Sequence, residues 1–167
     1  ESAIESLAEN LNDSLVAPLF WFVLLGLPGA ALYRFANTAD AMWGYPGPYA
    51  GRDWRWAGKW AAHADDVLSW LPARLSAALL IAVATLRRHA AARALRVEAG
   101  RTPSPNSGWP MAAMALVLDL RLAKPGVYAL HADGQPAGEG DIGRAAALGG
   151  RAVLAAAALA VLALGAA

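Results

Sequence analysis

The sequence predicts an all-α, polytopic membrane protein with kinked or re-entrant segments and polar loops. Hydrophobic residues make up 57% of the 167 residues, charged residues only 16%, and the mean hydropathy is +0.36. A typical soluble domain carries roughly a quarter charged residues. The apolar residues also gather in four blocks separated by polar stretches, which is the pattern expected when lipid is part of the solvent. An ordinary soluble enzyme is therefore excluded.

Charge and cysteine content remove further classes of protein. The 14 basic and 13 acidic residues leave a net charge of +1, which provides no positive field for a polyanion and predicts no nucleic-acid partner. The sequence has no cysteine, so it has no disulfide framework, no thiolate metal site and no cysteine nucleophile.

The first apolar block covers residues 14–33, which are 20 residues without a charge. At about 1.5 Å per residue, such a helix is long enough to cross a hydrocarbon core of ~30 Å. Pro18 and Pro28-Gly29 interrupt the block. We therefore expect a kinked or broken helix in place of a straight rod.

The other three blocks, 67–86, 111–118 and 152–167, differ in how well they suit a membrane. Residues 67–86 contain Arg74 and are free of charge only over the last 12 residues, so this block predicts a re-entrant or interfacial segment. Block 111–118 is shorter still, whereas 152–167 is uncharged throughout. We expect the first and last blocks to be the membrane helices.

The polar stretches between the blocks set the expected topology. Residues 87–110 contain five arginines against the single acid Glu98, so the positive-inside rule places this loop in the cytoplasm. If block 67–86 crossed fully, residues 34–66 would lie on the opposite side; if it is re-entrant, both loops face the cytoplasm. The short charge-free run favours the second arrangement. Residues 1–167 show no internal repeat or linker, so we expect one membrane-embedded domain in the cell inner (plasma) membrane, with active loops facing the cytoplasm.

Four acidic residues near the start, Glu1, Glu5, Glu9 and Asp13, recur every four residues. On a helix they form one stripe, where each like-charged pair costs a few tenths of a kcal/mol. The stripe therefore suggests a compensating cation, either Mg²⁺ on Glu5, Glu9 and Asp13 or arginines from elsewhere. A solvated helix face is the alternative. Asn10 and Asn12 add amide groups nearby.

A second polar group, Arg34, Asn37 and Asp40, follows the first apolar block at helical spacing. Arg34 could bind a phosphate or carboxylate while Asp40 holds a metal. Alternatively, Arg34 extends to the membrane interface and Asn37 or Asp40 caps a helix.

Two further groups come from the middle of the chain. Asp65 and Asp66 precede Arg74, and an arginine at membrane depth is costly unless paired, which indicates function. The turn sequence 104–110 contains two prolines and a glycine, so its backbone must leave the helix and its polar groups can meet a ligand or cap the next helix. The residues singled out in this turn are Ser104, Asn106, Gly108 and Trp109.

Six of the seven tryptophans lie in or beside the polar stretches. They could stack on a flat ligand, but an interfacial aromatic belt is the commoner arrangement. Two glycine-rich stretches, 51–60 and 138–143, do not meet the requirements of nucleotide loops. The first has the wrong glycine spacing and a tryptophan where a hydroxyl must reach Mg²⁺, and the second carries two acids and no βαβ context.

Taken in order, these segments resemble the adenosylcobinamide-phosphate synthase family of cobalamin biosynthesis, the CobD/CbiB type. The resemblance rests on four blocks between about residues 5 and 115. They are Glu5-Ser6-Leu7-Ala8-Glu9-Asn10 with Asp13 and Val16-Ala17-Pro18-Leu19-Phe20; Tyr33-Arg34 with Asn37-Thr38, Asp40-Ala41-Met42 and Gly44-Tyr45; Asp65-Asp66 with Trp70-Leu71-Pro72-Ala73-Arg74; and Ser104-Pro105-Asn106-Ser107-Gly108-Trp109-Pro110 with Ala112-Ala113-Met114-Ala115.

The resemblance implies a membrane enzyme that attaches aminopropanol or its phosphate to a propionate of adenosylcobyric acid through an amide bond, using ATP and Mg²⁺. It assigns catalysis to Asp13, Asp40, Asp65, Asp66 and Arg74, with Glu5, Glu9 and Asp13 as metal ligands. Substrate contacts fall to Arg34, Asn37, Asn10, Ser104, Asn106, Gly108 and Trp109. The implied partners are the corrinoid, the aminoalcohol phosphate, membrane lipid and other proteins of the cobalamin pathway.

Two features depart from the family pattern. Met111 stands where the family usually has an acidic residue, and the chain starts without Met inside the homologous region. We therefore expect the C-terminal part of a longer chain. The rival interpretations are a non-catalytic membrane transporter or sensory relative, in which paired charges line a pathway, and a structural subunit whose acidic stripe binds a partner.

Overall fold

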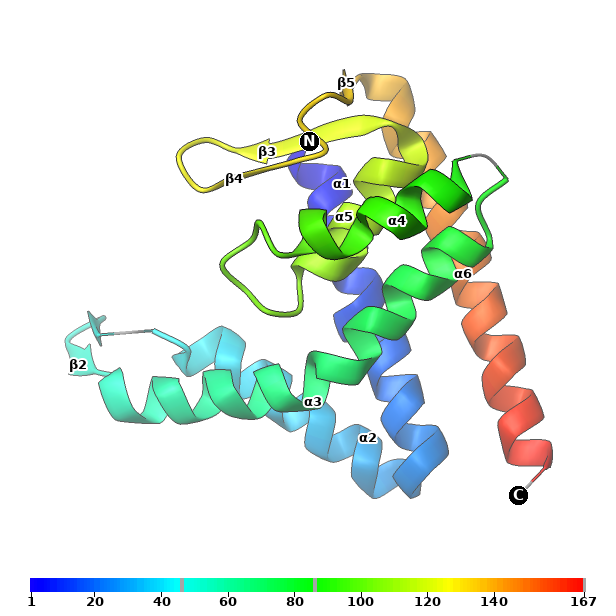
Figure 1. Ribbon diagram of the computed structural model, residues 1–167. Coiled ribbons are helices and arrows are strands. Elements are labelled where there is room, and N and C mark those ends of the chain that lie inside the picture. Colours follow the sequence, from blue (N-terminus) through cyan, green and yellow to red (C-terminus); the bar gives the residue numbers. More distant parts are fainter. Residues whose placement is uncertain (46, 86, 167) are drawn as a thin grey trace.

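The computed structural model describes residues 1–45, 47–85 and 87–166, and most of them are helical (Figure 1). In chain order the elements are α1 (Ser2–Leu11), the π-helical turn η1 (Asn12–Val16), α2 (Ala17–Trp43), β1 (Pro48–Tyr49), β2 (Arg52–Asp53), α3 (Arg55–Ala82), α4 (Arg88–Ala99), α5 (Gly108–Leu118), β3 (Leu120–Lys124), β4 (Tyr128–Leu130), β5 (Gln135–Pro136) and α6 (Glu139–Gly165). The predicted fold class was all-α, but the described residues also contain two small sheets made of short strands.

The first apolar block does not form one straight helix. At Gly26 the backbone takes φ 66° and ψ −158°, a conformation open essentially only to glycine, and the chain reverses there. In Figure 1 the first half of α2 descends and its second half returns. The return brings Arg34 to the backbone of Asp13, although 21 residues of straight helix would separate them by about 31 Å. A broken helix is therefore confirmed, but the break lies at Gly26 and not at Pro18 or Pro28-Gly29, and its effect is a helical hairpin.

The returning half of α2 packs along α3, and together they form an arm that ends in the β1–β2 hairpin (Figure 1). Pro72 lies inside α3 and has no N–H to donate to the carbonyl of Leu68. Trp21 from the first half of α2 fills this vacancy, because its Nε1 donates to the Leu68 oxygen at 3.0 Å. Pro72 of α3 thereby leaves a backbone oxygen that attaches the first half of α2 to α3.

Helix α5 is the centre of the hydrophobic core. Every residue from Pro110 to Leu118 is buried, and α1, α3, α4, α6 and the β3–β4 hairpin surround the helix. Large buried side chains such as Met114, Leu80 and Leu148 pack in this core. Strand β3 follows α5 directly and pairs antiparallel with β4 and parallel with β5.

The apolar blocks therefore have different structural roles. Two helical segments, Ser2–Trp43 and Glu139–Gly165, are long and apolar enough to cross a membrane. They contain the first block and residues 152–165 of the last block, although the first segment doubles back. Residues 67–82 of the second block belong to α3, which ends at Ala82, and block 111–118 belongs to the core helix α5. The last residues of two blocks, Leu86 and Ala167, lie outside the described residues.

Candidate functional site

A polar cavity of about 290 Å³ opens where η1, α2, α3 and the turn before α5 meet. Its lining comes from four separate parts of the sequence. The lining residues are Glu9, Asn12, Asp13, Asn37, Asp40, Ala41, Asp65, Ser69, Ser104, Asn106, Ser107 and Pro110. Four of these twelve are carboxylates and none is Lys, Arg or His, so the cavity favours a cation.

The π-helical turn places Asn12 and Asp13 at this cavity. Asn12 is 3% exposed; it accepts a hydrogen bond from Ser76 Oγ at 2.9 Å and donates from Nδ2 to Asp13 Oδ1 at 2.8 Å. In the widened turn, the N–H of Ala17 goes to the carbonyl of Asn12 in place of that of Asp13. The next donor in that register would be Pro18, which has no N–H. The backbone oxygen of Asp13 is thereby left for another donor.

Arg34 supplies that donor. Its Nη1 lies 3.0 Å from the Asp13 carbonyl oxygen and 3.3 Å from Asn37 Oδ1. The guanidinium therefore joins the two arms of the hairpin at the edge of the cavity. It is also exposed, so its other N–H groups face solvent.

Asp65 is the carboxylate most strongly perturbed by its surroundings among those on α3. Asn37 Nδ2 donates to its Oδ1 at 3.2 Å and Ser69 Oγ at 3.4 Å, and Tyr33 OH in turn lies 3.3 Å from Ser69 Oγ. Burial, with smaller contributions from nearby Asp13, Asp40 and Asp66, raises the pKa of Asp65 to about 6, although the Asn37 hydrogen bond opposes the shift. A carboxylate tuned in this way can accept and release a proton near neutral pH.

Asn106 ties the turn before α5 to α3. It is 4% exposed, its Nδ2 donates to the Asp66 carbonyl oxygen at 2.8 Å, and its Oδ1 accepts from Arg74 Nη1 at 3.1 Å. Burial raises the pKa of Asp66, while nearby His63 lowers it. The buried amide of Asn106 therefore holds the 104–110 turn against α3 and forms this side of the cavity wall.

Arg74 holds the same turn from the other side. Its guanidinium carbon lies 4.1 Å from the ring centroid of Trp70 and 4.5 Å from that of Trp109. It also donates to the backbone oxygens of Trp70 and Pro105. The guanidinium is thus stacked between two indoles, and it contacts a cavity residue without being part of the lining.

The structure divides the acidic stripe into two halves. Glu9 and Asp13 line the cavity, whereas Glu1 Oε2 accepts from the backbone N–H of Ala123 at 3.0 Å and Glu5 Oε1 accepts from Tyr128 OH at 2.9 Å. Burial, together with the Glu5 carboxylate, raises the pKa of Tyr128 to about 12. Hydrogen-bond donors of the β3–β4 hairpin therefore stabilise the carboxylates of Glu1 and Glu5, which form the first half of the stripe.

Of the fourteen residues assigned to catalysis, substrate contacts or metal binding, seven line the cavity: Glu9, Asp13, Asn37, Asp40, Asp65, Ser104 and Asn106. Arg34, Arg74 and Asp66 contact lining residues from outside. The other four lie elsewhere: Glu5 contacts Tyr128, Asn10 donates to the Ser6 carbonyl oxygen, Trp109 stacks on Arg74, and Gly108 packs closely against the Ala99 carbonyl and Thr102.

Four further polar side chains contribute to the site without an assigned role in the sequence motifs: Asn12, Ser69 and Ser107 line the cavity, and Tyr33 contacts Asp13 and Ser69. Ser69 follows Asp65 by four residues, which places both on one face of α3, and this spacing was a usable signal. Tyr33 is fully buried and could be recognised only once the hairpin had brought it beside Asp13. Met111, where the family pattern has an acid, is 2% exposed in the core, with its sulfur 3.9 Å from Tyr128 OH.

Metal binding at Glu5, Glu9 and Asp13 stays a prediction. Within residues 1–45, 47–85 and 87–166, no three Asp, Glu or His side chains form a group that could hold a metal ion on their own. A Mg²⁺ ion at the cavity would need further ligands from a substrate or from water, which is usual for Mg²⁺ bound with phosphates.

Comparison with known proteins gives a consistent result. The family model described as CobD/Cbib protein matches residues 1–159. A cobalamin biosynthesis protein CobD from Dehalococcoides mccartyi is 44% identical over 138 residues, covering 81% of this chain and 43% of the relative. A probable cobalamin biosynthesis protein CobD from Methanothrix thermoacetophila is 41% identical over 166 residues, covering 96% and 51%. That from Pyrococcus abyssi is 49% identical over 131 residues, covering 76% and 40%.

The chain thus spans about half, or less, of the length of these curated relatives. No solved structure matches it.

Proposed function

Because this chain belongs to the CobD/Cbib family, we propose that it carries a reaction site of cobalamin biosynthesis. The proposed reaction converts adenosylcobyric acid to adenosylcobinamide or its phosphate. An amide bond forms between a propionate of the corrin and the amine of aminopropanol or aminopropanol phosphate.

The observation that carries this proposal is the acidic cavity between α2 and α3. Its four carboxylates, three asparagines and three serines surround about 290 Å³, a space suited to a small polar molecule. An aminoalcohol enters as an ammonium ion and presents hydroxyl or phosphate oxygen a few bonds away. We assign its ammonium end to Asp13, Asp40 and Asp65, and its oxygen end to the amide and hydroxyl groups of Asn106 and Ser104.

The chemistry requires an activated carboxyl group and a neutral amine. ATP would transfer its terminal phosphoryl group to the corrin propionate; the amine nitrogen then attacks the acyl carbon and phosphate leaves as the amide forms. The attacking nitrogen must lose its protons, and Asp65, with a pKa of about 6, is suited to accept one of them. We assign this role of general base to Asp65, with Asp66 as the neighbouring alternative.

Mg²⁺ would supply charge neutralisation at the ATP phosphates, with Glu9 and Asp13 as its nearest protein ligands in the cavity. Arg34 reaches the cavity edge and its side chain is exposed, so we assign it to a phosphate or propionate oxygen. Arg74 has a different role in this proposal: it positions the 104–110 turn.

We place the site on the cytoplasmic side of the inner (plasma) membrane, where ATP is available. The two apolar helical segments support membrane association, and the arginines on and beside α4 favour a cytoplasmic position for that side of the molecule. Other proteins of the cobalamin pathway would be natural partners for handing over the corrinoid. Membership in this family does not favour the transporter or sensory alternative.

The test uses the longest form of the protein that the gene encodes, supplied with adenosylcobyric acid, aminopropanol phosphate or aminopropanol, and Mg-ATP. We expect corrinoid product that depends on ATP, and we expect the rate to fall in Asp13→Ala and in Arg74→Ala. Asp53→Asn, on β2 and in an exposed ion pair with Arg55, is the matched control. Product that persists undiminished in Asp13→Ala and Arg74→Ala would contradict these assignments, and corrinoid transport without ATP-dependent product would favour the rival function.

A further inference from the structure

The helix pair α2–α3 has two chemically opposite faces. On α2, Asn37 and Asp40 line the polar cavity, whereas Phe35, Ala39 and Trp43 lie on the other side. Helix α3 repeats this division: Asp65 and Ser69 line the cavity, and Trp60, His63 and Val67 lie opposite. The spacings of three, four and seven residues along each helix give one stripe per helix, apolar except for His63 on α3.

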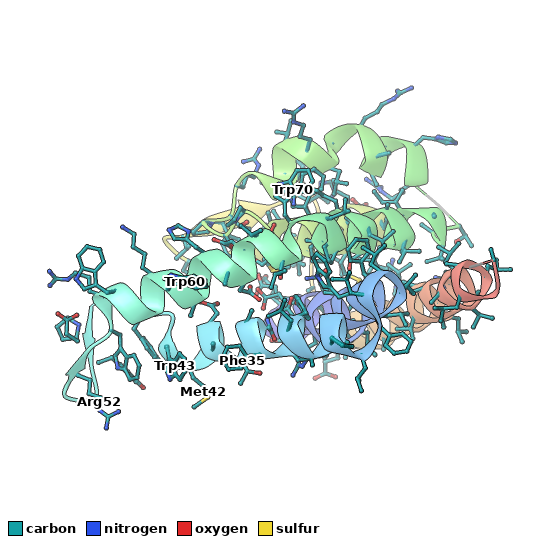
Figure 2. The ribbon with its side chains drawn as sticks, turned by 90° about the horizontal axis from the view of Figure 1, so that it is seen from below. Phe35, Met42, Trp43, Arg52, Trp60 and Trp70 are labelled. Atoms are coloured by element: carbon teal, nitrogen blue, oxygen red, sulfur yellow. The ribbon has the colours of Figure 1, made fainter. Side chains whose placement is uncertain are left out.

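These two stripes meet in a second hollow, an apolar groove of about 960 Å³ along the arm. Its large side chains are open: Trp56 is 78% exposed, Trp60 77%, Val67 74% and Phe35 66%. Figure 2 shows Phe35 and Trp43 on α2 and Trp60 on the neighbouring α3. A continuous apolar surface of this kind marks a binding surface, because water is a poor solvent for it.

The charges around the groove indicate what covers it. Arg52, Arg55 and Lys59 are exposed at the outer end of the arm, where the one acid among residues 51–60, Asp53, pairs with Arg55, so this end stays basic on balance. Lys59 follows Trp56 by three residues and precedes Trp60 by one. Tryptophan together with basic side chains at the edge of an apolar helix face complements the headgroup layer of an anionic bilayer.

The apolar surface also continues beyond the groove. At the reversal of α2, Leu24 and Leu25 are each 57% exposed and Leu27 is 72% exposed; on α6, Leu154 is 72% and Leu162 69% exposed. The α2 reversal and the end of α6 lie at the same end of the molecule, below the arm in Figure 1. Both belong to the segments that are long and apolar enough to cross a membrane.

We propose that the apolar face of α2–α3 lies in the headgroup region of a lipid bilayer, parallel to its surface, with the polar cavity on the opposite, water-facing side. The partner is an anionic lipid surface. This inference is independent of the proposed reaction, because it rests on the exposed apolar face and its basic edge alone.

The test uses the absence of cysteine from the sequence. Single variants Trp60→Cys and Val67→Cys carry an environment-sensitive fluorophore in the groove, and Arg93→Cys on the exposed face of α4 is the matched control. Each protein is reconstituted into vesicles of equal parts phosphatidylcholine and phosphatidylglycerol, and its helicity is checked by circular dichroism. We expect nitroxide-labelled lipid to quench the fluorophores at 60 and 67, and aqueous iodide to quench only that at 93.

Two outcomes would overturn the proposal. Iodide quenching at 60 and 67 as strong as at 93 would mean that the groove faces water. Exclusion of both quenchers would mean that protein, such as a second copy of the chain, covers it. A second test addresses the basic residues. In the Val67→Cys protein, we expect quenching by nitroxide-labelled lipid to weaken as phosphatidylglycerol is removed from the vesicles. Adding Arg55→Glu and Lys59→Glu to this protein should abolish the dependence of quenching on phosphatidylglycerol, whereas adding Arg93→Glu should leave it intact.

Discussion

Proline residues create two of the long-range attachments in this fold. Pro72 leaves the Leu68 carbonyl for Trp21, and Pro18, following a π-helical turn, leaves the Asp13 carbonyl for Arg34. In each case a missing N–H exposes a backbone oxygen that a distant side chain satisfies. The positions of these prolines were visible in the sequence. The donors were not, because each comes from a helix that only the reversal at Gly26 brings near.

Replacing Trp21 by Phe tests this account. The variant keeps an aromatic ring but leaves the Leu68 carbonyl without its donor, so we expect the free energy of unfolding to fall by about 1–2 kcal/mol. Chemical denaturation in detergent measures the change. Trp60→Phe, at a side chain that is 77% exposed, is the control and should leave stability unchanged. Equal stability of both variants would mean that the hydrogen bond contributes nothing.

Asp65 should lower stability above pH 6. Its raised pKa means that the folded protein binds a proton more tightly than the unfolded chain, so wild-type stability falls as pH rises from about 4 through about 6. Asn cannot ionise and keeps an oxygen that can accept from Asn37. We expect Asp65→Asn to be more stable than wild type by about 1 kcal/mol at pH 8, after allowing for the solvent that reaches this group.

That difference should shrink as the pH falls from 6 toward 4. Denaturation at several pH values measures it, and Glu139→Gln, on the exposed first turn of α6, serves as the charge-matched control. A variant that is less stable than wild type at pH 8 would show that the carboxylate stabilises its surroundings, and the assigned pKa direction would be wrong.

At the scale of the element, the reversal inside α2 decides whether a site forms at all. Gly26 holds a positive φ that an alanine would strain by about 1–3 kcal/mol. We therefore expect Gly26→Ala to lower the melting temperature and to loosen the contact between Arg34 and Asp13. Gly140→Ala in α6, where a Cβ would meet open space, is the control and should be neutral or slightly stabilising. Equal melting temperatures for the two variants would contradict a structural role of the reversal.

The turn before α5 depends on one side chain of α3. Arg74 stacks between Trp70 and Trp109 and also reaches Asn106, a combination that lysine cannot reproduce because it lacks the planar guanidinium. We expect Arg74→Lys to retain the charge but to lower stability by about 1–2 kcal/mol and to reduce turnover. Susceptibility of residues 101–108 to limited proteolysis is the measurement, with Arg93→Lys on α4 as control. Unchanged protection of the turn would mean that charge alone suffices.

Local sequence signals predicted the elements better than their arrangement. The charge-free run of 14–33 and the glycine and prolines within it predicted a broken helix, and the polar spacing of Arg34, Asn37 and Asp40 placed side chains of one helix near one site. Block 111–118 became a core helix, since α5 is apolar on all sides and too short to cross a bilayer. The direction of the chain after Gly26 depends on packing between distant segments, which no local pattern records.

For the whole molecule, the α2–α3 pair separates two environments. One face borders a cavity with four carboxylates, and the other is an apolar groove with basic residues at its end. The sequence motifs include all four carboxylates of the cavity, but in separate segments. Their assembly required the hairpin of α2, the π-helical turn and the 104–110 turn together. This arrangement places the polar cavity on one side of the helix pair and the apolar groove on the other.

The central claim is that the cavity is the site of amide formation, with Asp65 taking the proton from the amine. The rate of adenosylcobinamide or adenosylcobinamide-phosphate formation by Asp65→Asn, beside wild type and the distant control Asp53→Asn, tests it most directly. Loss of a general base predicts a rate about 100-fold or more below wild type in Asp65→Asn, with the folded protein intact and Asp53→Asn unaffected. A rate for Asp65→Asn equal to that of wild type across the pH range would contradict the claim.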